Sequence, residues 1–255
     1  MSGQTGLRLC YQDEAIVVVD KPGGLLAVPG RGPDRLDSVV SRIRALFPEC
    51  IEQPAAHRLD METSGLMVLG LTKGAHAHLS RQFAMRRVEK GYLALLEGTV
   101  VGSIGEIALR FRLNPENRPC QVYDPIQGKE GISRWRKLEL RGGRTLVAFT
   151  PLTGRTHQLR LHASHPLGLG CPIVGDRLYG MGRPGERLHL HSALLRFEHP
   201  TTGQWLVFSS SPDFAGGVLP PWGATDGSDG IGFPGRSGAG PCRVAPGLGR
   251  RSDPG

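Results

Sequence analysis

Short apolar runs of strand length outnumber helix patterns in this chain, and the two do not alternate regularly. The run at 16–19 is β-branched throughout and ends in an Asp-Lys-Pro-Gly-Gly turn, which is typical of a buried strand. Further strands are predicted at 66–71, 92–96, 135–140, 146–149, 188–197 and 205–209. Helices are predicted after an Asp37-Ser38 cap, after a Thr72 cap to about residue 87, and over 155–162. This order favours an α+β fold with a mixed sheet over a doubly wound parallel sheet.

The composition changes near residue 215. Before it, apolar runs, turns and amphipathic stretches mix, whereas Gly and Pro dominate from 216 to 255 and large apolar residues become sparse. Such a segment buries too little apolar surface to offset the entropy lost on ordering. We therefore expect one folded domain at 1–215 and a disordered tail at 216–255.

Charge and cysteine content narrow the class of protein. The 31 Lys and Arg residues against 23 acidic ones give a net charge of +8, which attracts polyanions, although many basic proteins merely have solvated side chains. The 5 cysteines are scattered and never form a Cys-x-x-Cys pair, which argues against a disulfide framework and a cysteine zinc site. No apolar stretch is long enough to span a membrane. A soluble cytoplasmic protein is expected.

The densest chemical segment is 57–65, which reads His-Arg-Leu-Asp-Met-Glu-Thr-Ser-Gly and precedes the predicted strand at 66–71. A carboxylate in a polar turn at a strand entrance suits a reactive site, so Asp60 is a candidate. On local sequence alone, an Asx-turn role that accepts backbone hydrogen bonds explains Asp60 better. A carboxylate glycosidase is a further alternative, with Glu62 as the near candidate for its second acid.

A second cluster at 153–160, Thr-Gly-Arg-Thr-His-Gln-Leu-Arg, places basic residues at a predicted helix start, where free amides also favour anions. A solvated basic helix face would explain it equally well. Tyr92 lies in a predicted strand, where a tyrosine is by default a core or edge residue. The chain lacks a phosphate loop, a dinucleotide fingerprint, a His-Glu-x-x-His motif and a nucleophile elbow. His189 and His191 lack an obvious third ligand, so no metal site is predicted.

Taken together and in order, four blocks resemble the RluA-type family of pseudouridine synthases across nearly the whole region from 11 to 214. They are Lys-Pro-Gly-Gly-Leu at 21–25, the segment 57–65, Lys-Gly-Tyr-Leu-Ala-Leu at 90–95 and Gly-Arg-Thr-His-Gln-Leu-Arg at 154–160. Weaker support comes from 172–180 and 190–194. The sequence departs from the family at Gly-Ile-Ser 131–133 and at Cys171, where Ala-x-Thr and His are common.

The resemblance implies a pseudouridine synthase fold: a mixed, mainly antiparallel sheet flanked by helices and loops, with an active-site cleft across it. It implies that Asp60 is the nucleophile, that Tyr92 is an active-site tyrosine and that Arg155 pairs with the aspartate. Arg58 resembles a residue that fills the space vacated by a flipped nucleotide.

The other site residues expected from these blocks are the RNA contacts His57, Arg58, Thr63 and Arg160. The implied activity isomerises uridine to pseudouridine in ribosomal RNA or a tRNA stem-loop. It needs no metal or organic cofactor, because no redox change occurs. We expect a monomer without an S4 domain, and no DNA partner. The alternative is a non-catalytic RNA-binding protein that retains the fold.

Overall fold

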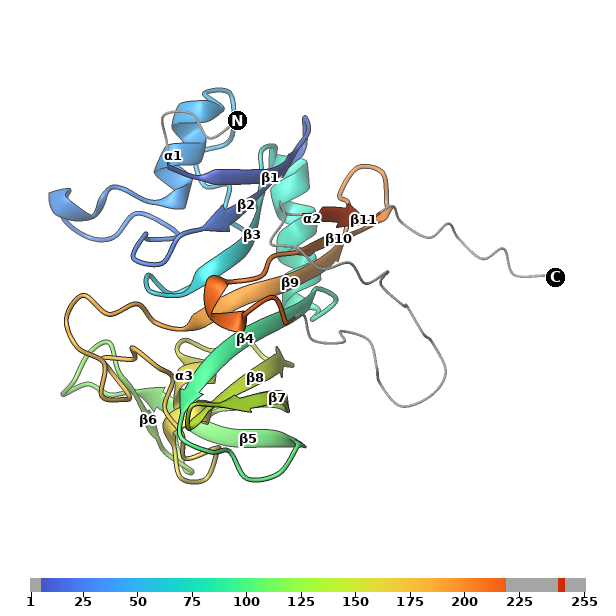
Figure 1. Ribbon diagram of the computed structural model, residues 1–255. Helices are drawn as coiled ribbons and strands as arrows, with labels where there is room; N and C mark the ends of the chain where they lie inside the picture. Colours follow the sequence, from blue (N-terminus) through green and yellow to red (C-terminus); the bar gives the residue numbers. More distant parts are fainter. Residues whose placement is uncertain (1–5, 219–242, 246–255) are drawn as a thin grey trace.

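The computed structural model describes residues 6–218 and 243–245, in which strands form one extended sheet with three α-helices packed around it (Figure 1). The strands are β1 (Arg8–Gln12), β2 (Ile16–Lys21), β3 (Ser64–Gly70), β4 (Glu89–Glu97), β5 (Ile104–Leu113), β6 (Gln121–Tyr123), β7 (Lys129–Arg141), β8 (Arg144–Pro151), β9 (Leu190–Glu198), β10 (Trp205–Ser209) and β11 (Arg243–Ala245). The helices are α1 (Val39–Leu46), α2 (Lys73–Ala84) and α3 (Gln158–Ser164), with short 3-10 turns at Pro33–Arg35 and Asp213–Ala215.

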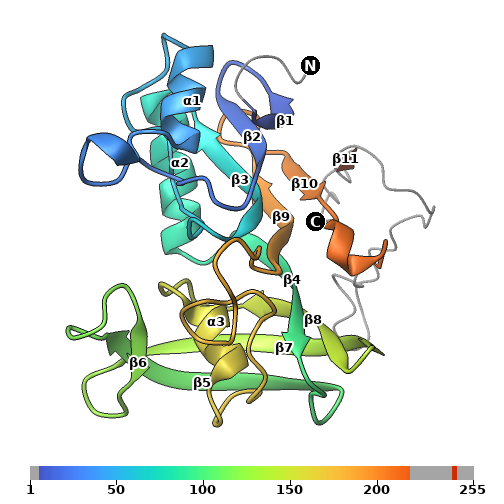
Figure 2. The same cartoon turned by 60° about the vertical axis from the view of Figure 1, so that its left-hand side comes forward.

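The sheet is mixed and mostly antiparallel, as predicted. Its strand order is β1-β2-β3-β9-β4-β8-β7-β5-β6, and β10 pairs with the outer part of β9. Between the strands of the described chain, the one parallel pairing joins β3 to β9, where Ser64 lies opposite His191 and Gly65 opposite Ser192. β9 therefore connects the half of the molecule that carries β1–β3 to the half that carries β4–β8 (Figure 2).

β2 and β3 are covered on both faces, which explains their uninterrupted apolar sequences. Val17 and Val19 of β2 pack in the cluster that includes α1, whereas Ile16 and Val18 pack in the cluster that includes α2. Successive side chains of a strand point to opposite faces, so both faces need apolar residues. Both predicted helix caps are confirmed, because the Ser38 and Thr72 hydroxyls accept hydrogen bonds from the backbone amides three residues on.

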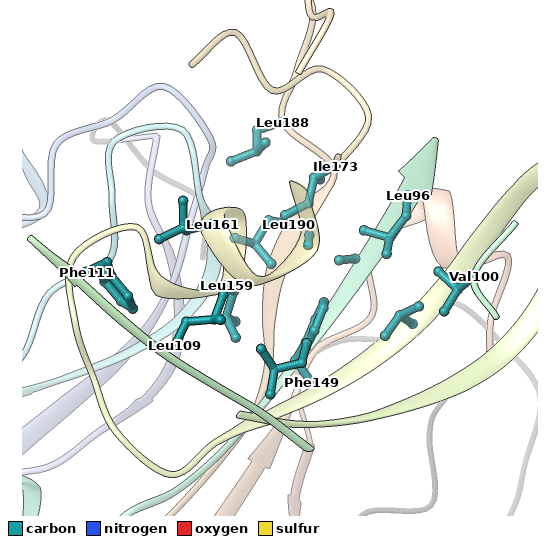
Figure 3. Close-up of a cluster of buried hydrophobic side chains, with 14 residues drawn as sticks. Leu96, Val100, Leu109, Phe111, Phe149, Leu159, Leu161, Ile173, Leu188 and Leu190 are labelled. Carbon is teal, nitrogen blue, oxygen red and sulfur yellow. The ribbon is translucent and has the colours of Figure 1, made fainter. Parts of the chain in front are cut away.

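A third buried cluster fills the space between α3 and the half of the sheet that carries β4–β8 (Figure 3). Leu159 and Leu161 of α3 meet Leu109 and Phe111 of β5 and Phe149 of β8 in this cluster. The cluster fixes α3 on the sheet and with it the polar residues that flank Leu159 and Leu161. In the part of the chain that the structure describes, no helix is long and apolar enough to cross a membrane.

The structure adds strands that the sequence analysis did not predict, namely β1, β5, β6 and β11. β11 departs from the expectation of a wholly disordered tail, because Arg243–Ala245 pairs antiparallel with β10. Residues 216–218 are also described, and Val218 packs against a buried cluster of β4, β8 and β9. The remaining positions of the expected tail lie outside the described residues.

Candidate active site

Asp60 lies in the loop that leads into β3, and backbone hydrogen bonds fix the loop on both sides of it. The Thr63 amide donates to the Asp60 carbonyl at 3.1 Å, which closes a turn around the aspartate. The next carbonyl, of Met61, accepts from the Gly24 amide at 2.9 Å. The Asp60 side chain is 25% exposed. Its carboxylate is thus held by a rigid loop and stays reachable from solvent.

Lys21 stabilises this loop through a buried ammonium group. Its side chain is fully buried, and its ammonium donates to the carbonyls of Pro22, Leu25 and Met61 at 2.7–2.9 Å. Burial lowers the pKa of Lys21 to about 8, and the negative charges of Asp60 and Glu62 oppose that shift. Lys21 thus joins the glycine turn after β2 to the aspartate loop, a role the sequence analysis did not assign to it.

The His157 side chain lies close to the Asp60 carboxylate. Its Nε2 lies 3.9 Å from Oδ2 of the aspartate, and its ring is largely buried. The backbone of His157 adopts the left-handed conformation with φ 55° and ψ 17° immediately before α3. A residue with a Cβ held in a sparsely populated region costs about 1–3 kcal/mol, and such residues cluster at functional sites. The sequence analysis quoted the motif but gave this histidine no role.

Gln158 holds the turn that contains His157. Its Oε1 accepts from the Thr153 hydroxyl at 2.6 Å and from the Arg155 amide at 3.0 Å. Its Nε2 donates to the Ile132 carbonyl at 2.9 Å and to the Ser133 hydroxyl at 2.8 Å. The amide oxygen and the amide nitrogen thus each have two partners. These bonds fix the loop against β7 and compensate for the backbone strain at His157.

Arg160 and Asp176 form a buried ion pair behind this loop. Nε and Nη2 of the arginine donate to the two carboxylate oxygens at 2.8 and 2.6 Å. Burial opposes the charge on Arg160, but the hydrogen bonds and charge of Asp176, and then the charge of Asp60, raise its pKa. Arg160 thus lies within electrostatic reach of Asp60.

Tyr179 joins the ion pair to His157. Its hydroxyl lies 2.9 Å from Nδ1 of His157 and accepts from the Gln121 amide at 2.6 Å. The Arg160 guanidinium lies over its ring, 5.3 Å from the centroid, and Asp176 accepts from its backbone amide. The site therefore rests on residues of 172–180, a block that gave only weak support in the sequence.

Tyr92 approaches from β4, between β8 and β9. Burial raises the pKa of Tyr92 to about 12, a hydrogen bond from Ser192 lowers it, and the charge of Asp60 raises it. The phenol is therefore neutral at physiological pH and lies within electrostatic reach of the aspartate. The β4–β9 register shifts between Gly91 and Tyr92, a bulge of the kind that re-aims side chains beside active sites.

The structure does not bring Arg155 to Asp60 as expected. Arg155 is exposed, its Nε donates to the Glu130 carbonyl at 3.3 Å, and it forms no ion pair with Asp60 within the described residues. The physical reason is that α3 begins only at Gln158, so Arg155 lies on the outer turn while Arg160 lies on the buried face.

His57 also departs from its expected contact with RNA. Its Nε2 accepts the Val68 amide at 3.1 Å, and its ring stacks on Phe83 with centroids 4.3 Å apart. Burial, with the nearby charge of Lys90, lowers the pKa of His57 to about 3. The ring thus joins β3 to the last turn of α2.

Arg160, a further predicted RNA contact, is instead buried in its ion pair with Asp176 and does not reach the surface. Arg58 is exposed beside Asp60, and the buried hydroxyl of Thr63 has no partner among the described residues. Glu62, the second acid of the glycosidase alternative, pairs with Arg177 at 3.1 Å. No group of three or more metal-ligating side chains occurs in the part of the chain that the structure describes. The arrangement is a candidate active site centred on one carboxylate, with a histidine, a tyrosine and an arginine around it.

Comparison with known proteins agrees with this fold. A family model described as RNA pseudouridylate synthase matches residues 15–165. The dual-specificity RNA pseudouridine synthase RluA of Haemophilus influenzae is 42% identical over 212 residues, which cover 82% of this chain and 94% of that protein. The protein of that name from Escherichia coli K12 is 40% identical over the same shares. The human RNA pseudouridylate synthase domain containing 1 superposes with a TM-score of 0.67 at 32% identity, covering 82% of this chain and 85% of that one.

The chain therefore belongs to the RNA pseudouridylate synthase family, and it is an RNA-modifying isomerase. The family resemblance and the α+β fold predicted from sequence are confirmed.

Proposed function

We propose that this enzyme isomerises specific uridines in large-subunit ribosomal RNA and in a tRNA anticodon stem-loop, with Asp60 as the nucleophile. The observation that carries the proposal is the position of the Asp60 carboxylate. It is partly exposed, lies beside His157 and is within electrostatic reach of Arg160 and Tyr92. The dual target follows from the relatives at 40–42% identity, whose name specifies dual specificity.

The chemistry suits one carboxylate. Breaking the bond between uracil N1 and the ribose requires an adduct or a stabilised positive charge, and Asp60 can provide either. The uracil then turns, rejoins the sugar through C5 and loses the C5 proton. Tyr92, neutral and in reach of Asp60, stacks on the base and assists that proton transfer. The base leaves and returns without a redox change, so we propose no metal or organic cofactor.

The target nucleotide must leave its stack before the carboxylate can reach it. Arg58, exposed next to Asp60, occupies the vacated position, and the unpartnered Thr63 hydroxyl binds the nucleotide. Arg155, on the exposed turn before α3, contacts an RNA phosphate instead of pairing with Asp60. We further propose that the enzyme acts on RNA and not on DNA, as a monomer in the cytoplasm.

Pseudouridine formation by the full chain tests the proposal. Wild-type protein and the Asp60→Asn variant are incubated with ribosomal RNA and tRNA transcripts, and pseudouridine is mapped base by base. We expect wild-type turnover on both RNAs, none with Asp60→Asn, and similar RNA affinity for the two proteins. Asp34→Asn, an exposed aspartate of a 3-10 turn, is the matched control and keeps full activity.

Turnover by purified Asp60→Asn would remove Asp60 as the nucleophile. Binding of both RNAs by the wild type without any pseudouridine would instead favour a non-catalytic RNA-binding protein. Modification of one RNA class alone would restrict the proposal to that class.

A further inference from the structure

We propose that His157 is a positioning residue for Asp60: its Nε2–H points at the carboxylate, and the Tyr179 hydroxyl fixes that orientation. The inference rests on the proposed role of Asp60 and adds two residues to the machinery of the reaction. It stands on the 3.9 Å between Nε2 and Oδ2 and on the 2.9 Å between Nδ1 and the tyrosine hydroxyl. These contacts place the imidazole directly between Asp60 and Tyr179.

Hydrogen-bond capacity decides which ring nitrogen carries the proton. The Tyr179 hydroxyl already accepts from the Gln121 amide, so its own proton has His157 Nδ1 as its partner. Nδ1 then acts as acceptor, and the proton of a neutral imidazole sits on Nε2, facing Asp60. The opposite tautomer would set a lone pair against the carboxylate and leave the phenol proton without this partner. Burial raises the pKa of Tyr179, which keeps that proton in place.

The charges around His157 fit a neutral ring. Burial lowers its pKa, Asp60 and Asp176 oppose the shift, and Arg160 and Arg58 add to it. Around neutral pH the ring therefore offers one N–H and adds no full positive charge. At 3.9 Å this N–H lies just outside hydrogen-bond distance, and contacts of this kind often tighten only when substrate is bound.

The backbone supports the same role. A left-handed conformation at a residue with a Cβ persists only where the surroundings enforce it, and here the Gln158 hydrogen bonds do so. That conformation turns the His157 side chain toward Asp60 just before the helix begins. A glycine or asparagine would adopt the same backbone at lower cost, so the histidine is present for its ring.

Three variants of the full chain test the inference: His157→Gln, Tyr179→Phe and the double variant. Single-turnover pseudouridine formation is measured from pH 5 to pH 9 on an RNA that the wild type modifies, alongside RNA affinity. We expect His157→Gln to lower the rate about 10- to 100-fold, with RNA affinity within about twofold of the wild type. Tyr179→Phe should cost about tenfold in the wild type and nothing further in the His157→Gln background, because it acts through the histidine.

The pH profile separates positioning from a merely structural role. In the wild type, acidification protonates Nδ1 of His157, which can then no longer accept from the Tyr179 hydroxyl, so the fixed orientation of the ring is lost. His157→Gln has no ring to protonate, so its loss of rate on the acidic side should move to lower pH. Equal rates in wild type and His157→Gln, additive losses in the double variant, or an unmoved acid limb would each overturn the inference. Absence of pseudouridine with the wild type would instead be a failure of the proposed function.

Discussion

Arg160 and Asp176 meet as a two-pronged ion pair whose side chains are 4% and 1% exposed. Asp176 comes after α3 on the long connection to β9, so this contact ties α3 to the connection that follows it. Two charges so deeply buried are stable only together, because either one alone would be a desolvated ion without a partner.

Comparing Arg160→Lys with Arg155→Lys separates the two arginines of the motif. Lysine keeps the charge but lacks the planar fork, so Arg160→Lys should lower the rate of pseudouridine formation by about 100-fold or more. Arg155→Lys keeps a cation on the exposed turn and should stay within about threefold of the wild-type rate. Single-turnover rates at saturating RNA give the comparison. A severe defect in Arg155→Lys beside an active Arg160→Lys would restore the original assignment of Arg155.

Gly65 is required where β3 meets β9. Its φ is 109°, and a Cβ built on it would lie 2.3 Å from the Ser192 carbonyl oxygen. Gly65→Ala should therefore lower the free energy of unfolding by more than about 1 kcal/mol, and disturb Tyr92, which Ser192 contacts. Gly74→Ala is the matched control. Gly74 lies in α2 with open space around it, so alanine should stabilise by about 0.5–1 kcal/mol. Urea unfolding of both variants measures the difference, and equal midpoints would contradict the close approach.

His162 should make the protein less stable in acid. It is fully buried, neither ring nitrogen has a partner within the described chain, and burial lowers its pKa to about 4. The unfolded chain, with a histidine pKa near 6.5, binds more protons between these values, so stability falls as pH drops through this window.

Replacing His162 by leucine removes that proton uptake. Between pH 7 and pH 5, the free energy of unfolding of His162→Leu should fall by about 2 kcal/mol less than that of the wild type. Urea unfolding at both pH values measures it. Identical losses in the two proteins would show that the buried ring does not titrate in this window.

Local sequence patterns predicted much of the fold. The apolar runs at β2, β3 and β8 and the two hydroxyl caps are visible in the sequence because burial and capping each leave a local signature. β5 was missed although Ile107, Leu109 and Phe111 alternate with exposed residues, which is the pattern of a half-buried strand. β1 and β6 are short edge strands, and their pairing depends on distant partners.

The site was predictable only in part. The motif contains both Arg155 and Arg160, and periodicity alone does not show which of them is buried. That depends on Asp176, 16 residues beyond Arg160, and on a helix that begins later than the sequence pattern indicates. The positioning role of His157 follows from its left-handed backbone and its contact with Tyr179. The sequence around His157 indicates neither of them.

The central place of β9 has a consequence for the order of events during translation. The Asp60 loop and the Tyr92 strand lie in two halves of the sheet that are joined through β9, which ends at residue 198. A nascent chain with only the first 180 residues outside the ribosome holds every proposed catalytic group but not the strand that brings them together. Because such long-range pairing must await synthesis of its last strand, we expect the enzyme to gain activity only after β9 has left the ribosome.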